Sequence, residues 1–213
     1  IKAWLVEEPS IPFTALELRF EGGASLDPEG KRGVTNLMMG LLEEGSGDLD
    51  ARAFAEARES IAARYEFDAF DDTVTISAQF LTENREASVA LLREALLNPR
   101  FDADAVERVK GQVASGIRSD LKDPDEISSA TFFELAFGEH PYGTSLEGTL
   151  ESVNALTAED LEAARQAALV KDRLHVGAVG DITAEELGTL LDDLLGGLPQ
   201  TGPALPERVE FGL

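Results

Sequence analysis

The chain has 213 residues, 43% of them hydrophobic and 28% charged, which is the composition of a soluble globular protein with one substantial core. With 41 acidic residues against 18 Lys and Arg, its formal net charge is −23. This charge argues against nucleic acid and anionic lipid as ligands. It indicates a solubilising acidic surface, with a basic peptide or basic partner chain as the alternative. Cysteine is absent, so disulfides and thiolate metal sites are excluded. The apolar runs are shorter than the ~18 residues of a membrane helix, so we expect no membrane insertion.

The N-terminal part of the chain shows strand patterns followed by helix patterns. Leu16, Leu18 and Phe20 alternate with the charged Glu17 and Arg19, which is typical of a strand with one buried face. The same reasoning predicts strands over residues 2–6, 13–20, 65–70 and 73–80, and helices over residues 34–42 and 50–64.

The C-terminal part is predicted to be mainly helical. Val106, Val109, Val113, Ile117 and Leu121 recur at helical spacing and predict a buried stripe on one long helix. Predicted helices cover residues 84–97, 102–121, 125–137, 157–169 and 183–195, and a buried strand covers residues 174–179. Residues 199–206 contain three Pro and one Gly and are predicted to be a linker, and residues 207–213 are predicted to begin an interrupted strand.

The helix predicted from residue 34 carries a glycine in an unusual position. Its apolar residues recur at the spacing of one buried face, while Asn36, Met39 and Gly40 share the neighbouring stripe. A Gly inside a helix costs about 1 kcal/mol relative to Ala. We therefore expect Gly40 to have a reason other than helix stability.

Several motifs around this helix match one known family. A strand that ends in Gly22-Gly23, the helical stretch 33–46, the loop His140-Pro141-Tyr142-Gly143 and the Gly180-Asp181 turn follow one another in the order of an M16 repeat. The chain resembles the M16 metallopeptidases, which include insulinase, pitrilysin and the mitochondrial processing peptidase. In that family the helix carries His-x-x-Glu-His, with two zinc ligands and the general base, and a later helix supplies a Glu ligand.

The resemblance places this chain's residues at each of those positions. Asn36 stands at the first His, Met39 at the Glu, and Gly40 at the second His. Gly116, 76 residues after Gly40, stands at the last ligand. Met cannot take up a proton and Gly offers no ligand atom, so we predict no catalytic residues, no metal site and no cofactor.

The resemblance also implies the fold. We expect an α+β, two-layer sandwich in which a mostly antiparallel sheet of five or six strands has helices packed on one face. Residues 1–198 would form one M16-like domain similar to the first repeat. Residues 199–213 would form an inter-repeat linker and the start of a possible second repeat.

An edge strand is the predicted peptide-binding element. In the M16 family the first strand of the hairpin carries Asn-Ala and pairs with the substrate peptide; the matching pair here is Asp68-Ala69. Such pairing uses backbone groups and can survive the side-chain change. An ordinary edge strand guarded by charged residues is the alternative.

The two histidines, His140 and His175, are interpreted as structural residues. His140 lies in a turn beside Pro141, and His175 lies within a predicted strand. Neither has a second candidate ligand at a recognised spacing.

We rank three hypotheses about function. The first is a non-catalytic subunit or domain that forms half of a peptide-binding clamshell with a zinc-bearing M16 partner subunit or second repeat. The second is a structural core-type subunit without a proteolytic role, and the third is a self-sufficient hydrolase with an unrecognised site. The chain begins with Ile rather than Met, so we expect a processed piece, with the periplasm favoured over the cytoplasm.

Overall fold

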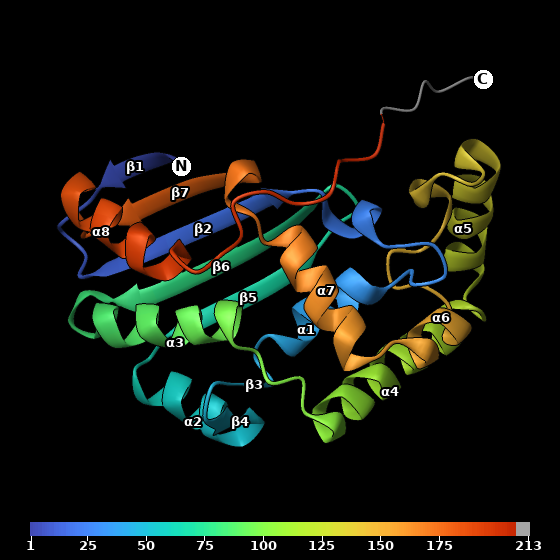
Figure 1. Ribbon diagram of the computed structural model, residues 1–213, viewed down its shortest axis with the longest axis horizontal. Helices are drawn as coiled ribbons and strands as arrows, with labels where there is room; N and C mark the ends of the chain where they lie inside the picture. Colours follow the sequence, from blue (N-terminus) through green and yellow to red (C-terminus); the bar gives the residue numbers. More distant parts are fainter. Residues whose placement is uncertain (208–213) are drawn as a thin grey trace.

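The fold is built on one five-stranded sheet with the strand order β1-β7-β2-β6-β5 (Figure 1). A computed structural model describes residues 1–207. β1 runs parallel to β7, and the other neighbouring strands are antiparallel. The strands are β1 (Lys2–Glu7), β2 (Phe13–Glu21), β5 (Arg64–Ala69), β6 (Thr73–Leu81) and β7 (Leu174–Gly180), and a separate two-stranded sheet consists of β3 (Gly45–Ser46) and β4 (Leu49–Asp50).

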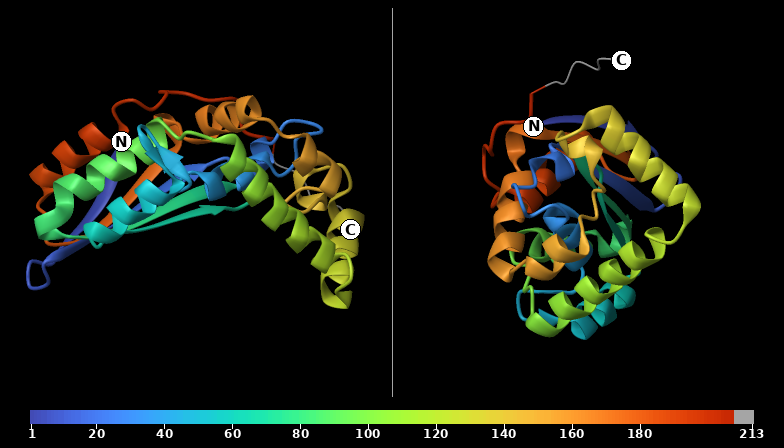
Figure 2. Two further views of the ribbon diagram at one scale, coloured as in Figure 1. Left: turned by 90° about the horizontal axis from the view of Figure 1, so that it is seen from below. Right: turned by 90° about the vertical axis from the view of Figure 1, so that its right-hand side faces the viewer.

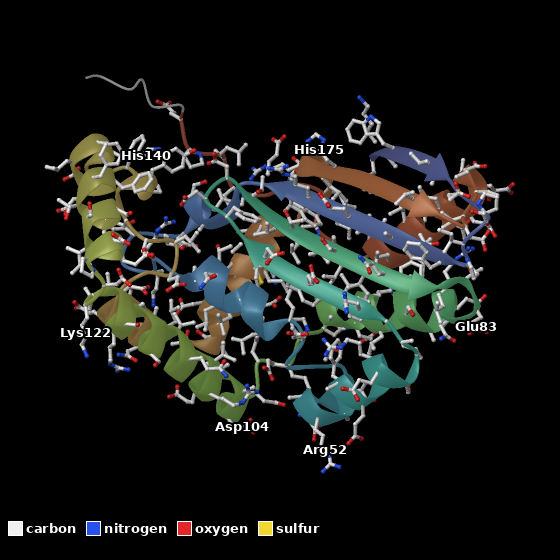
Figure 3. The ribbon with its side chains drawn as sticks, turned by 180° about the vertical axis from the view of Figure 1, so that it is seen from behind. Arg52, Glu83, Asp104, Lys122, His140 and His175 are labelled. Carbon is white, nitrogen blue, oxygen red and sulfur yellow. The ribbon has the colours of Figure 1, made fainter. Side chains whose placement is uncertain are left out.

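The α-helices lie on one side of the large sheet and leave its other face open, except that the helix at residues 124–137 lies beyond the end of the sheet (Figures 1, 2 and 3). This confirms the predicted α+β architecture with a mostly antiparallel sheet. The helices are α1 (Val34–Leu41), α2 (Ala51–Ser60), α3 (Arg85–Leu97), α4 (Ala103–Asp120), α5 (Pro124–Phe137), α6 (Leu150–Ala155), α7 (Ala158–Ala168) and α8 (Ala184–Leu195), with short 3₁₀ turns that include η1 (Gly23–Leu26) and η3 (Pro141–Gly143).

The core lies between the sheet and the helices. Leu16, Leu18 and Phe20 are at most 2% exposed, whereas Glu17 and Arg19 between them lie on the open face. Period-two alternation therefore gives β2 one buried side, as predicted. Each such apolar side chain contributes about 1.5–3 kcal/mol when it is fully buried.

Three sequence-based expectations need adjustment. The helix predicted over residues 50–64 ends at Ser60, and Ala62, with φ 52°, turns the chain into β5. Leu121 is 63% exposed, so the buried stripe of α4 stops at Ile117. α6 was not predicted, because a six-residue helix has too few turns to show a periodic pattern. Of the predicted final strand, residues 208–213 lie outside the described residues.

Residues 199–207 form neither helix nor strand and run back along the domain. The backbone carbonyls of Pro199 and Gln200 accept hydrogen bonds from Lys171 and Asp172, at 3.0 and 3.1 Å. In the part of the chain that the structure describes, no helix has the length and apolar character needed to cross a membrane.

Candidate functional site

The candidate site lies where α1 packs against α4. α1 begins after Gly33, which has φ 97°. The side chain of Asp27 accepts hydrogen bonds from the backbone N–H groups of Gly33 and Thr35, at 2.8 and 3.1 Å. These bonds satisfy two of the donors that a helix N-terminus leaves free. Only Gly fits at position 33, because a Cβ atom there would lie 2.4 Å from the Glu147 carbonyl oxygen.

The three signature residues of α1 have different environments. Met39 is 1% exposed and belongs to the hydrophobic core. Asn36 is half-buried and Gly40 is exposed. A Cβ atom at Gly40 would meet its nearest neighbour, Val109 of α4, at 3.8 Å. Position 39 therefore contributes to packing, and positions 36 and 40 lie nearer the helix surface.

Gly116 of α4 shares a neighbour with the start of α1. A Cβ atom at Gly116 would lie 3.8 Å from Oε2 of Glu147, the residue whose backbone carbonyl contacts Gly33. Glu147 therefore lies next to both Gly116 of α4 and Gly33 at the start of α1. Glu147 was not identified from the sequence, because it lies in a loop and has no partner at a recognised spacing.

These residues do not fit a zinc ion. Met39 is buried among apolar side chains, and Gly40 and Gly116 have no ligand atom. Of the four signature positions only Asn36 has a side chain with a polar ligand atom, and one such group falls short of the three protein ligands of a catalytic zinc. Within residues 1–207, no group of three or more His, Cys, Asp or Glu side chains is arranged to hold a metal ion.

A groove lies beside this contact, between α4, α5 and the start of α6. Its volume is about 440 Å³, and Ile117, Leu121 and Ile127 supply apolar surface. Three acidic side chains also line it: Asp120, Glu126 and Glu151.

Burial raises the pKa of Glu147, next to this groove, and the charges of Asp120 and Glu126 raise it further. The uncompensated negative charge and the apolar surface suit a ligand with basic and apolar side chains.

β5 forms one edge of the sheet, as predicted. It pairs only with β6 among the described strands, so its outer backbone groups are not used by the sheet. Asp68 is exposed and Ala69 half-buried, opposite Thr75 and Val74 of β6.

The two histidines lie on different segments, His140 at the start of η3 and His175 on β7 (Figure 3). His175 is on the open face of the sheet, where its Nε2 lies 2.9 Å from Oε1 of Glu21 and its ring stacks on Trp4. Nδ1 of His140 accepts a hydrogen bond from the backbone N–H of Tyr142 at 3.2 Å. Both residues contact neighbours that position them within the fold.

The family model for insulinase, peptidase family M16, matches residues 2–150. The chain belongs to the M16 family. Among curated relatives, it is 28% identical over 194 residues to "Non-peptidase homolog YmxG" of Helicobacter pylori, a match that covers 91% of this chain and 45% of the relative. A probable mitochondrial-processing peptidase subunit beta of Schizosaccharomyces pombe is 25% identical, with 91% of this chain and 42% of the relative covered.

Two solved structures are similar to this chain in fold. The M16 inactive domain from Pseudomonas fluorescens matches with a TM-score of 0.91 and 27% identity, over 99% of this chain and 51% of that one. The periplasmic protease PqqL of Escherichia coli has a TM-score of 0.79 at 19% identity, over 96% of this chain and 24% of that one, a likeness of fold alone. The chain spans less than half the length of the two curated relatives from Helicobacter pylori and Schizosaccharomyces pombe.

Proposed function

We propose that this M16 domain is the non-catalytic half of a peptide-binding assembly whose zinc is carried by a partner subunit or second repeat. The observation that carries the proposal is the contact between α1 and α4, where Met39 is buried and Gly40 and Gly116 offer no ligand. Hydrolysis by zinc needs protein ligands and an activated water. The similar proteins described as a non-peptidase homolog and an inactive domain support this proposal.

The proposed role in this assembly is to hold an extended peptide along β5, beside Asp68 and Ala69. A peptide that adds to a sheet edge gains its main affinity from backbone hydrogen bonds, which do not require the family's Asn-Ala pair. The acidic groove next to Glu147 supports a preference for peptides with basic residues.

α5 is the proposed contact surface for the partner. None of its residues is buried, and Phe132 and Leu135 are 62% and 82% exposed. Large apolar side chains gathered on an exposed helix are typical of a protein interface. Under this proposal residues 1–198 are a first M16 repeat, residues 199–213 lead toward a second one, and the assembly works in the periplasm.

A zinc titration combined with peptidase assays tests the proposal. We expect no one-to-one zinc binding in calorimetry and no peptide hydrolysis by this chain alone. Hydrolysis should appear when it is mixed with an M16 chain that has an intact His-x-x-Glu-His motif. The triple variant Asn36→His/Gly40→His/Gly116→Glu is the matched control, because the space at positions 40 and 116 allows a side chain, and it should gain zinc binding.

Two outcomes would contradict this function. Stoichiometric zinc binding with hydrolysis by the unmodified chain alone would show a self-sufficient enzyme. Stable association with the zinc-bearing chain, but no change in hydrolysis, would favour the structural core-type subunit.

Peptide addition to β5 has its own test. NMR spectra of the labelled chain should show the largest shifts over residues 64–69 when an extended basic peptide is added. Methylation of the peptide nitrogens that face β5 should abolish those shifts, because it removes the peptide's donors to the ladder. Methylation of the intervening nitrogens is the control and should leave the shifts in place. Equal effects of the two methylation patterns would count against edge-strand binding.

A further inference from the structure

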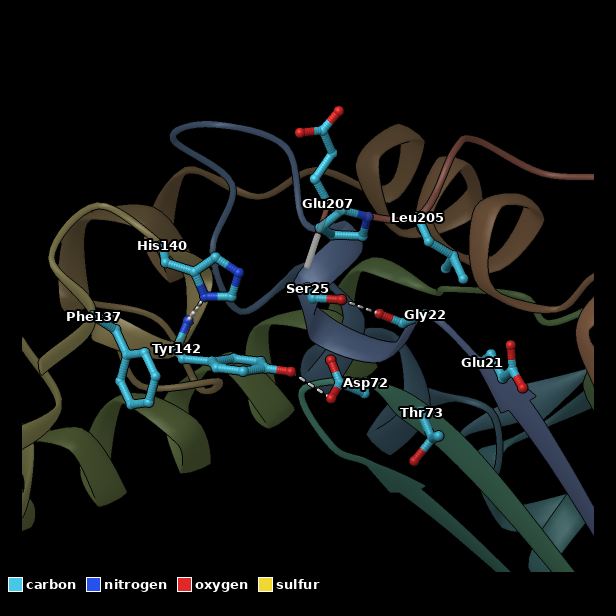
Figure 4. Close-up of a pocket in the computed structure, with 11 residues that line it drawn as sticks. Glu21, Gly22, Ser25, Asp72, Thr73, Phe137, His140, Tyr142, Leu205 and Glu207 are labelled. Carbon is cyan, nitrogen blue, oxygen red and sulfur yellow. Dashed lines mark hydrogen bonds between the residues drawn. The ribbon is translucent and has the colours of Figure 1, made fainter. Parts of the chain in front are cut away.

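A cavity of about 370 Å³ lies beyond the tip of the β5–β6 hairpin, away from the α1–α4 contact (Figure 4). It is enclosed by η1, the hairpin turn, the loop that contains η3, and the segment at residues 205–207. Its size is within the ~300–1,000 Å³ typical of small-ligand sites. The side chains that matter for its chemistry are Glu21, Asp72, Phe137, His140, Tyr142 and Glu207.

The walls of this cavity are fixed by the fold itself. The backbone N–H groups of Gly22 and Ala24 donate to the carbonyls of Asp72 and Phe70, at 2.6 and 2.8 Å. Gly23, with φ +45°, permits this approach, since a Cβ atom there would lie 2.2 Å from the Phe70 carbonyl oxygen. η1 and the hairpin turn therefore form one rigid wall.

Arg32 links this wall to the η3 loop. Its guanidinium donates to the carbonyl of Ala24 in η1 at 2.5 Å, to the carbonyl of Pro141 at 3.0 Å, and to the carboxylate of Asp71 at 2.7 Å. The charge of Asp71 is thereby compensated. Asp72, the next residue, forms no salt bridge with any described residue, and its carboxylate faces the cavity.

The cavity combines carboxylates with aromatic rings. The Tyr142 hydroxyl donates to Oδ2 of Asp72 at 2.5 Å, and this bond raises the pKa of Tyr142 to about 12. The rings of His140 and Tyr142 lie edge to face, with their centroids 4.4 Å apart. Glu21 and Glu207 add further negative charge, and among the described residues that line the cavity none is Lys or Arg.

We propose that this cavity binds the guanidinium side chain of an arginine in a peptide. Asp72 and the carboxylate of Glu21, whose Oε1 also lies 2.9 Å from Nε2 of His175, would accept hydrogen bonds from the guanidinium. One of the rings of His140 and Tyr142 would pack against its planar face, and the other, at 80° to the first, would border its edge. Arginine fits this combination better than lysine, because its flat group forms paired hydrogen bonds to carboxylates and stacks on rings. An anionic ligand would meet only negative charge here. This inference does not rest on the proposed edge-strand role.

Calorimetric titration of the full chain with the peptide acetyl-Ala-Ala-Arg-Ala-Ala-amide tests the inference. We expect one-to-one binding that weakens about tenfold or more when citrulline, a neutral isostere, replaces the arginine. Asp72→Asn and Glu21→Gln should each weaken binding by about tenfold as well. Glu83→Gln is the matched control, because it removes an equal charge from an exposed position at the far end of the sheet, and it should leave the affinity unchanged.

Several results would overturn the inference. The first is no binding at millimolar peptide, and the second is equal affinity for the arginine and citrulline peptides. The third is an unchanged affinity in both the Asp72→Asn and the Glu21→Gln variants, provided that these variants still unfold cooperatively. Free argininamide that binds as tightly as the peptide would overturn the assignment to a peptide side chain. The edge-strand proposal is tested separately, by methylation of the peptide nitrogens, so each of the two proposals can fail without the other.

Discussion

α1 and α5 are both rich in apolar residues, yet they occupy opposite environments. In α1, six of eight residues are buried, including Leu37, Met38 and Met39. In α5, none of the 14 residues is buried, although Phe132 and Phe133 lie at its centre. α1 packs between β5, α4 and α7, whereas the main neighbours of α5 are η3 and α4. Apolar content alone therefore does not decide burial; the number of elements packed around a helix does.

The apolar side chains of the two helices should therefore have different roles, in α1 for stability and in α5 for recognition. In α1, Met39 is part of the core, so that helix serves packing. In α5, the exposed apolar side chains should stabilise the isolated domain little, and they form the proposed partner surface. Substitutions in the two helices should accordingly have very different effects.

The largest expected contrast is between Leu37→Ala and Phe132→Ala. Leu37 is 1% exposed, and its truncation should lower the free energy of unfolding by about 2–5 kcal/mol, through lost burial and a residual cavity. Phe132 is 62% exposed, and its truncation should cost less than about 1 kcal/mol. Urea denaturation of both variants measures this contrast. A large loss for Phe132→Ala would show that α5 is already packed in the isolated domain.

Arg32→Ala should have the next largest effect. Arg32 joins η1, the hairpin turn and the η3 loop that adjoins α5. Its removal leaves the Ala24 and Pro141 carbonyls without these donors and should cost about 2–4 kcal/mol of unfolding free energy. Arg32→Lys should recover only part of this, because one ammonium group cannot reach all three segments. Full recovery by lysine in thermal unfolding would contradict this account.

Gly40→Ala should act in the opposite direction. Gly40 is an exposed helical residue with room for a methyl group, because a Cβ atom would meet Val109 at an ordinary 3.8 Å. Ala is favoured over Gly in a helix, so stability should rise by about 0.5–1 kcal/mol. Gly33→Ala is the control and should be destabilising, because its backbone φ and the Glu147 carbonyl both exclude a side chain. A loss of stability for Gly40→Ala would mean that position 40 needs glycine for another reason.

The smallest expected effect concerns Glu147, which lies beside α1 and is influenced by the charge of Glu126 in α5. Burial, then the charges of Asp120 and Glu126, raises its pKa above the usual value of 4.5. The folded state therefore binds this proton more tightly than the unfolded chain does. This contribution to stability is present below the unfolded pKa and is lost as the pH rises through the folded pKa.

Glu147→Gln removes this titration. The variant should be more stable than the unmodified chain at neutral pH, by about 0.5 kcal/mol or less because the group is partly solvent-screened. The difference should shrink below the unfolded pKa, where Glu147 is protonated in both states. Urea midpoints measured on both sides of that pKa check the sign. An advantage of the Glu147→Gln variant that grows toward acid pH would contradict the assigned cause.

The sequence predicted most elements because local patterns reflect one-sided burial. β2 alternates Leu16, Leu18 and Phe20 inward, and the capping box of Thr183 and Glu186 marks the start of α8. Both signals are contained within a few neighbouring residues. Motif order similarly identified the M16 family and placed Asn36, Met39 and Gly40 on one helix.

The tertiary structure alone decided the surroundings of those residues. It showed that Met39 enters the core, that Glu147 lies between Gly33 and Gly116, and that the apolar residues of α5 stay exposed or half-buried. It also brought Arg32 to Pro141, 109 residues away in the chain. Local periodicity states which face of an element is apolar, but not which distant segment covers that face. Which segment covers an apolar face depends on how the whole chain packs around its sheet.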